Sequence, residues 1–195
     1  MWLRDPTRAP RAGFLFRCGL VALAITVTDA WPSGPSSADP VLSAQAWQIV
    51  NDGVMGGLSQ ATLIAAGEGL IFRGALSREN NGGFVSARRA IDYDLEAATG
   101  VQLTVRGDGR RYQFRVRQDK NFDGVAWRAT FATGQDWQTV TLDFEDFEPV
   151  FRGQRVSNAG PVVPAMIRQI GFLLADGPEG DFRLDVAALQ WLRDR

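Results

Sequence analysis

The sequence predicts an all-β protein, an antiparallel β-sandwich or jelly roll of about eight or nine short strands. Apolar and polar residues alternate along several segments, as they do in strands that have one face in the core and one in solvent. Gly is frequent, with 21 of 195 residues, and turn sequences such as Gly107-Asp108-Gly109 and Asp123-Gly124 separate the alternating segments. Short strands with regular turns between them are typical of two packed sheets.

The N-terminal 30 residues have the composition of a targeting segment. Arginines at positions 4, 8, 11 and 17 precede an apolar run at residues 18–27, which suits the core of a signal peptide and is short for a membrane span. We therefore expect residues 1–30 to be a signal peptide or a membrane anchor, so that the protein is exported to the periplasm or held at the membrane. An organelle transit peptide, mitochondrial for example, is the alternative, because residues 1–17 hold many arginines and a single acid.

The rest of the chain is predicted to be a linker at residues 31–44, rich in Pro, Ser and Ala, followed by one β-sandwich domain at residues 45–193. Residues 145–165 contain three prolines and are predicted to cross the sheet edge as a long irregular excursion, and a turn at 95–98 is the only helical candidate. The predicted strands are residues 61–66, 69–76, 83–90, 101–105, 112–116, 127–131, 137–144, 168–175 and 181–191.

Composition removes several classes of catalytic and metal site. The chain has no His, which excludes imidazole acid–base catalysis, Ser-His-Asp triads and His-ligated metals. Its single Cys, Cys18, lies in the apolar N-terminal run, so a mature domain holds no thiol for a disulfide or a zinc site. The net charge is −1 and no basic run stands out, which argues against a nucleic-acid partner.

One segment matches the first half of a calcium-binding loop, Asp119-x-Asn121-x-Asp123-Gly124. The twelfth position, where that loop needs a bidentate Glu, is Thr130, and the flanking residues alternate like strands instead of forming paired helices. We interpret the segment as a hairpin turn, with a weak calcium site as the alternative. We accordingly expect neither a metal nor another cofactor.

Residues 47–59 and 79–84 combine Gly, Asn and acidic residues with large apolar ones. Gly accepts positive φ without steric cost, and Asn and Asp side chains bond nearby backbone, so such segments form tight, fixed loops at strand ends. Gly57 and Gly83 are candidates for positive φ. Asp52 and Asp108 are expected to accept backbone N–H bonds within their loops.

Four arginines in three consecutive predicted strands are expected to share one face of a sheet. Period-two geometry places Arg106, Arg115, Arg117 and Arg128 opposite the aromatic side chains if the three strands are neighbours. Such a face is either simply solvated or a binding face, and guanidinium forks suit the carboxylates of an acidic protein surface or a polar ligand. We take these four residues as the candidate partner-binding face.

The loop segments resemble the complex I intermediate-associated protein 30 family. The resemblance implies a galactose-binding-domain-like β-sandwich and a non-enzymatic, chaperone-like role in NADH:ubiquinone oxidoreductase assembly, with respiratory-complex subunits or assembly intermediates as protein partners. It brings no catalytic residue. It rests on residues 47–59 and 79–84, on Phe72-Arg73-Gly74, Trp137-Gln138, Phe151-Arg152-Gly153 and Ile170-Gly171-Phe172, and on a segment around Tyr112. The motif-loop residues, structural or partner-binding, are Trp47, Asn51, Asp52, Met55, Gly56, Gly57, Ser59, Asn80, Asn81, Gly82, Gly83, Phe84, Gly107, Asp108, Gly109 and Tyr112.

Two further functions are open from the sequence. A carbohydrate- or glycan-binding jelly-roll module of the cell envelope needs exposed aromatic rings, and the tryptophans at positions 47, 127, 137 and 191 are candidates, although such residues more often lie in the core. A carboxylate-based hydrolase needs two acids that face each other across a cleft, and Asp52 and Asp108 are the candidates.

Overall fold

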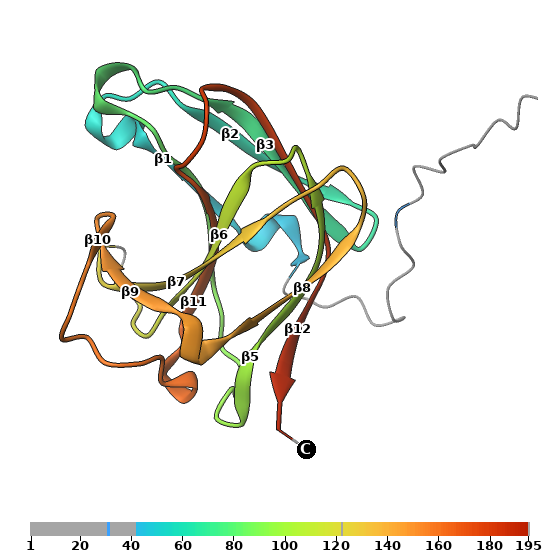
Figure 1. Cartoon of the computed structure of the whole chain (residues 1–195), viewed down its shortest axis with the longest axis vertical. Coiled ribbons are helices and arrows are strands. Elements are labelled where there is room, and N and C mark those ends of the chain that lie inside the picture. The colour runs from blue at the N-terminus through green and yellow to red at the C-terminus, as the bar shows by residue number, and fades with distance from the viewer. Residues whose placement is uncertain (1–30, 32–41, 122, 195) are drawn as a thin grey trace, which may run out of the picture. The chain divides into compact units, whose positions relative to one another are not determined.

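Two antiparallel β-sheets pack face to face in the computed structural model, which describes residues 31, 42–121 and 123–194 (Figure 1). This confirms the predicted fold class. The segment expected to be a signal peptide or membrane anchor, residues 1–30, lies outside the described residues. Within the described part of the chain, no helix has the length and apolar character needed to cross a membrane.

The strand order of each sheet brings distant segments together. In both sheets, paired strands run antiparallel. The seven-stranded sheet has the order β1 (Gln48–Asn51), β4 (Val85–Ala90), β11 (Gln169–Leu174), β6 (Arg111–Arg117), β7 (Ala126–Ala132), β9 (Glu148–Phe151) and β10 (Gln154–Arg155). The five-stranded sheet has the order β2 (Gln60–Ala66), β3 (Gly69–Leu76), β12 (Gly180–Arg193), β5 (Ala98–Gly107) and β8 (Gln138–Asp143).

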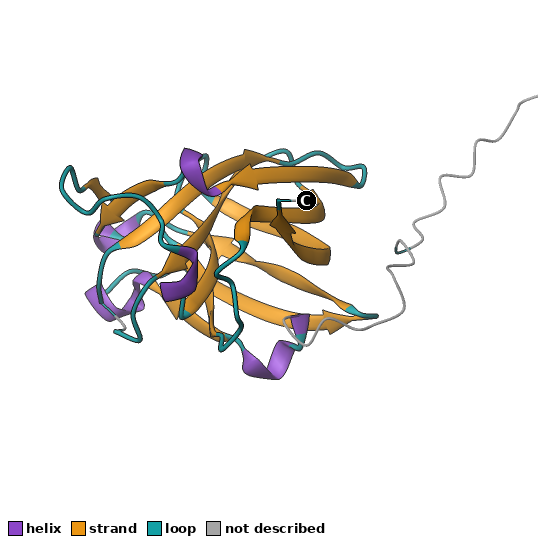
Figure 2. Ribbon diagram, turned by 90° about the horizontal axis from the view of Figure 1, so that it is seen from below, coloured by secondary structure: helices purple, strands orange, loops and turns teal. Residues whose placement is uncertain are grey.

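In the part of the chain that the structure describes, helix occurs only as short 3-10 turns at the margins of the sheets (Figure 2). Gly56 and Gly82 follow η3 and η4 directly and end them, and η6 begins at Pro164. The described turns are η2 (Ala44–Ala46), η3 (Asp52–Met55), η4 (Glu79–Asn81), η5 (Phe144–Asp146) and η6 (Pro164–Met166).

The core lies between the two sheets and is built by alternate residues of their strands. Phe72 of β3, Phe114 of β6 and Phe172 of β11 are fully buried, and the ring centroids of Phe114 and Phe172 are 5.5 Å apart. Trp47, just before β1, stacks on Phe172 at 5.5 Å. Burying a side chain of this kind contributes about 1.5–3 kcal/mol. These residues therefore fix which face of each sheet points inward, and the opposite face is left for other contacts.

Each predicted strand has a counterpart in the structure, whereas β1, β9 and β10 were not predicted. β1 and β9 have four residues each, too few to show alternation, and β9 carries Pro149, which cannot donate a ladder hydrogen bond. The prediction of an irregular excursion at residues 145–165 is wrong for residues 148–155, because β9 pairs with β7 and β10 pairs with β9, which extends the seven-stranded sheet.

Two residues of the expected linker pack against the domain. Leu42 is buried in the core, and the ring of Trp31 meets that of Trp137 edge-on, with their centroids 4.9 Å apart. Both Trp31 and Leu42 precede residue 45, where the domain is expected to begin.

Candidate functional site

The carboxylate of Asp52 joins the two motif loops. The side chain is fully buried, and its oxygens accept hydrogen bonds from the N–H (3.0 Å) and hydroxyl (2.5 Å) of Ser59 and from the N–H groups of Gly83 (2.6 Å) and Phe84 (3.3 Å). Burial raises the pKa of a carboxyl group, but here the hydrogen bonds outweigh it, so the pKa of Asp52 lies below its ordinary value of 3.8. Asp52 is thus held as a carboxylate that links the loops.

Two glycines leave room for this carboxylate. A Cβ at Gly57 would lie 2.4 Å from Cγ of Asp52, and a Cβ at Gly82 would lie 2.6 Å from its Oδ2. Gly83 has a φ of 130°, as expected, but Gly57 does not have positive φ, so that expectation is wrong. Gly57 is needed for close packing against Asp52 and not for its backbone conformation.

The outer parts of the two loops are also tied together. Gly56, Asn80 and Asn81 adopt positive φ (88°, 55° and 59°), and Nδ2 of Asn80 donates to the carbonyl of Gly56 at 3.2 Å. Asn51, the last residue of β1, is half-buried, whereas Met55 is 62% exposed. Most of the motif residues therefore shape the loops, and Met55 is presented to solvent.

Asp108 is the centre of a second hydrogen-bond network, at the turn between β5 and β6. Its carboxylate accepts bonds from the Tyr112 hydroxyl (3.1 Å) and from the N–H groups of Arg110 (3.1 Å) and Arg183 (3.0 Å). Tyr112 is buried, and burial together with the charge of Asp108 raises the pKa of its hydroxyl. Asp108 and Asp52 have no partner in common, and each is occupied by backbone donors.

Glycine is required at two points of the same turn. Gly109 has a φ of 85°, in the left-handed region that disfavours a side chain. A Cβ at Gly107 would lie 2.6 Å from Oγ1 of Thr133. These two motif residues are therefore explained by the shape of the turn.

Arg106 does not lie with the other three predicted arginines. Its strand, β5, belongs to the five-stranded sheet, whereas β6 and β7 belong to the seven-stranded sheet. The prediction of one face shared by all four is therefore wrong. Arg106 instead pairs with the buried Asp185 of β12 at 2.8 Å, and its guanidinium lies 4.8 Å from the ring centroid of Trp137. Alternation decides which face of its own strand a residue occupies, but not which strands are neighbours.

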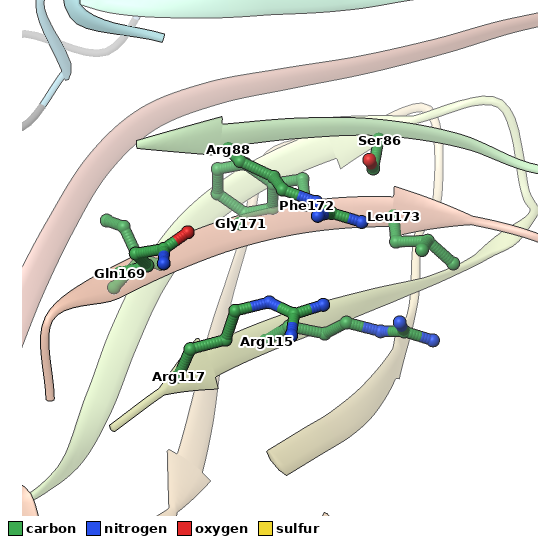
Figure 3. Close-up of a pocket in the computed structure, with 9 residues that line it drawn as sticks. Ser86, Arg88, Arg115, Arg117, Gln169, Gly171, Phe172 and Leu173 are labelled. Carbon is green, nitrogen blue, oxygen red and sulfur yellow. The ribbon is translucent and has the colours of Figure 1, made fainter. Parts of the chain in front are cut away.

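The other arginines line the outer face of the seven-stranded sheet. The register places Arg88 of β4, Gly171 of β11, Arg115 of β6 and Arg128 of β7 in one row across the strands. Arg117 lies two residues along β6 and thus on the same face. Figure 3 shows Arg88 on one side of β11 and Arg115 and Arg117 on the other. We call Arg88, Arg115, Arg117 and Arg128 the arginine face.

Burial and mutual repulsion both act on these guanidinium groups. Burial, and then the charges of Arg117, Arg128 and Arg88, lower the pKa of Arg115 to about 10. Burial and the charge of Arg117 likewise lower the pKa of Arg88 to about 10. Both side chains stay protonated at neutral pH. The fold therefore holds several half-buried positive charges close together, which opposes folding unless an anion is nearby.

Two members of the arginine face bond to neutral groups. Arg115 donates to Oε1 of Gln113 at 2.6 and 3.0 Å, and Arg117 donates to the carbonyl of Gly124. Neither forms an ion pair with a described residue. Arg128 pairs with Glu148 of β9 at 3.3 Å. The positive charge around Arg115 and Arg117 is thus only partly balanced by carboxylates.

Sequence reasoning missed Arg88 and the polar residues packed beside it. Ser86, Gln113 and Gln169 are buried although they point away from the core. Ser86 Oγ donates to the carbonyl of Val50 at 2.8 Å. One signal was present, because Gly171 lies in the motif Ile170-Gly171-Phe172. Only the strand register shows that this glycine lies between two arginines.

The loop that resembles half of a calcium site is held by protein contacts. Oδ1 of Asp119 accepts from the N–H of Asn121 at 2.9 Å, Asp123 pairs with Arg152 at 2.5 Å, and Nε2 of Gln169 donates to the carbonyl of Asp119 at 3.0 Å. The described residues include no cluster of three or more acidic, His or Cys side chains suited to a metal ion. The contacts are those of a turn that covers one end of the outer face.

Aromatic rings are absent from the described rows around the arginine face. Trp47 and Trp127 are buried in the core, and Trp137 packs beside Arg106 on the other sheet. The outer-face rows consist of Gln48, Arg88, Gly171, Arg115, Arg128 and Glu148, of Val50, Ser86, Leu173, Gln113 and Thr130, and of Ala90, Gln169 and Arg117. This face offers no ring for stacking on a sugar.

Solved structures share the fold at low sequence identity. The family 11 carbohydrate-binding module of a cellulosomal cellulase of Clostridium thermocellum superposes with a TM-score of 0.58 and 15% identity, over 76% of this chain and 88% of that module. The module from the same organism in complex with a β-1,3-1,4-mixed-linked tetrasaccharide gives a TM-score of 0.55 and 16% identity, over 76% and 89% of the two chains. These likenesses establish the architecture.

Sequence comparison gives a closer relation. A mouse (Mus musculus) protein, complex I intermediate-associated protein 30, mitochondrial, is 32% identical over 116 residues. The match covers 57% of this chain and 34% of the mouse protein, so the chain spans about a third of the length of that relative. The family model for complex I intermediate-associated protein 30 matches residues 36–186. The chain therefore belongs to the complex I intermediate-associated protein 30 family.

Proposed function

We propose that the protein is a non-enzymatic binding module that holds a protein partner, and that this partner is a subunit or an assembly intermediate of a respiratory complex. Family membership and the name of the mouse relative support the class of partner. The two candidate acids, Asp52 and Asp108, belong to separate networks of structural hydrogen bonds, which supports a role without catalysis.

The observation that carries the proposal is the arginine face. Arg88, Arg115 and Arg128 form one cross-strand row, with Arg117 beside it, on a sheet face that points away from the core. The strands fix the backbone positions of these arginines, and hydrogen bonds already hold Arg115 and Arg117, which reduces the conformational entropy lost when a partner binds. Arg is enriched in protein interfaces, and its planar fork suits carboxylates. An acidic protein surface is the complement of this face.

Glycan binding is the weaker alternative. The likeness to carbohydrate-binding modules shows the fold alone, and the described rows of the arginine face contain no aromatic ring. Compartment is a separate question, decided by the N-terminal sequence of the mature protein. The mitochondrial relative supports organelle targeting, and the charge pattern of residues 1–27 supports export or membrane anchoring.

Affinity purification of the tagged full chain from solubilised membranes tests the proposal. We expect respiratory-complex subunits to co-purify with the wild type and to be lost from the double variant Arg115→Glu/Arg117→Glu. The matched control is Arg73→Glu/Arg193→Glu, which makes the same charge change at exposed positions of the five-stranded sheet. Equal capture by the two double variants would remove the arginine face as the binding site.

A further inference from the structure

The arginine face has a hollow at its centre, above Gly171. Gly171 pairs with Arg88 on one neighbouring strand and with Arg115 on the other. Two strand spacings separate these arginines, roughly 10 Å at the backbone. Every other described member of the row carries a side chain, and the stem of Arg88 leans toward Gly171, with its Cγ 3.5 Å from where a Cβ of Gly171 would lie. A residue larger than glycine does not fit at position 171 without a shift of the backbone, because its Cβ would lie 2.8 Å from the carbonyl oxygen of Ala87.

The lining of this hollow is cationic and polar on most sides. Its walls include Arg88, Arg115, Arg117, Ser86 and Gln169, and Leu173 closes one end (Figure 3). The hollow is shallow, with room for about one water-sized group. Its size therefore admits one oxygen of a terminal carboxylate, and the second oxygen and the rest of the side chain would lie at its mouth.

The charges around the hollow favour an anionic group. Arg115 lies directly across from Arg128, and like charges at opposed positions of a sheet destabilise it. Arg115 and Arg117 form no ion pair with a described residue and donate to Gln113 and Gly124 instead, although the more distant carboxylates of Asp119, Asp123 and Asp176 offset part of the positive charge. A guanidinium keeps further N–H donors when one or two are used. An oxyanion in the hollow would accept such donors and offset the repulsion.

We propose that the hollow above Gly171 binds one carboxylate group, supplied by a Glu or Asp side chain of an acidic segment of the partner protein. The choice of a protein carboxylate rests on the proposed function, and a free small carboxylate shares the same chemistry. Planar guanidinium forks from the two strands that flank β11 reach the carboxylate from both sides. The remainder of the acidic segment lies across the arginine face.

Calorimetric titration of the full-length chain at low salt with an N-acetylated, C-amidated tetraglutamate peptide tests this site. We expect saturable binding that falls at least about tenfold in Arg115→Gln and in Arg88→Gln, because each loses charge-assisted hydrogen bonds. Arg73→Gln should bind like the wild type, and tetraglutamine should not bind. Acetate that competes at millimolar concentration would assign the site to a free carboxylate. Tetraglutamate that binds none of the proteins, or all of them equally, would overturn the proposal.

A second comparison needs no ligand. Arg115→Glu and Arg115→Gln both remove the guanidinium, but only Glu places a carboxylate among Arg88, Arg117 and Arg128. We expect Arg115→Glu to melt a few degrees above Arg115→Gln at low salt, and the gap to shrink at 1 M salt. Equal melting temperatures for the two variants would contradict the proposal that the hollow favours an anion. If Arg115→Glu/Arg117→Glu loses partner capture but the wild type does not bind tetraglutamate, the carboxylate site in the hollow is refuted and the proposed function stands. If the wild type binds tetraglutamate but the double variant captures the partner as well as the wild type does, the proposed function is refuted and the carboxylate site stands.

Discussion

The carboxylate of Asp52 accepts a 2.6 Å hydrogen bond from the backbone N–H of Gly83, which is 31 residues away in the sequence. Ser59 and Phe84 donate to the same carboxylate, so the two motif loops share one acceptor. Because every donor points at this buried group, replacing it leaves several N–H groups without a partner. The loops therefore depend on Asp52 more than on any contact at their surface.

We expect Asp52→Asn to lower the free energy of unfolding by on the order of 3 kcal/mol, since the amide places an N–H₂ group against backbone donors. Urea denaturation of the variant and the wild type measures this loss. Asp136→Asn, at an exposed position, is the control and should change stability little. A loss below about 1 kcal/mol for Asp52→Asn would show that the loops are held by other contacts.

The same carboxylate gives a pH dependence with a defined sign. The pKa of Asp52 is lowered in the folded chain, so its contribution to stability is complete above the ordinary value of 3.8 and is lost as pH falls through the lower, folded value. We expect the stability difference between wild type and Asp52→Asn to be constant from pH 7 to 5 and to shrink below pH 4. Denaturation curves at these pH values measure it. A difference that persists unchanged well below pH 3 would contradict the assignment.

Three glycines in the motif loops should respond differently to Ala. Gly57→Ala forces a methyl against Asp52, and Gly83→Ala requires positive φ of an L residue, so each should lose about 1–3 kcal/mol. Gly53 has neither constraint, since a Cβ there meets no atom within 4 Å. Gly53→Ala should melt at or above the wild-type temperature. Thermal unfolding of all three variants measures these differences. Equal melting temperatures for Gly53→Ala and Gly57→Ala would contradict the close packing of Gly57 against Asp52.

Sugars should leave the tryptophan fluorescence unchanged. Trp47 and Trp127 are buried, the half-buried Trp137 and Trp191 pack against Trp31 and Phe144, and the described rows of the arginine face carry no ring. We therefore expect no saturable emission change on titration with a β-1,3-1,4-mixed-linked tetrasaccharide at millimolar concentration. A family 11 carbohydrate-binding module serves as the positive control. A saturable change in this protein would reverse the order of the two proposed binding functions.

Strand positions followed from the sequence because burial on one face imposes a period of two. The predicted strand at residues 69–76 coincides with β3, and the segment at 112–116 lies inside β6. The sequence did not predict β1 and β9, because four residues are too few to show a period of two and because Pro149 argues against a strand at β9. Length and ladder chemistry thus account for the missed elements.

The candidate site was only partly predictable, because neighbours in a sheet are not set by alternation. Arg115 and Arg117 were placed on a common face correctly, since both lie on β6. Arg106 was grouped with them, but its strand pairs with β12 and β8 in the other sheet. Arg88 was missed because β4 meets β6 only through β11, from the far end of the chain. Long-range register, which local sequence does not encode, assembles the arginine face.

Quantitative recovery of respiratory-complex subunits with the full chain tests most directly whether the arginine face holds a protein partner. The informative number is the ratio of subunits recovered by Arg115→Glu/Arg117→Glu to those recovered by Arg73→Glu/Arg193→Glu, with both proteins folded and equally abundant. A ratio near zero, with the control at the wild-type level, is the expected result. A ratio near one would show that the partner, if there is one, binds elsewhere.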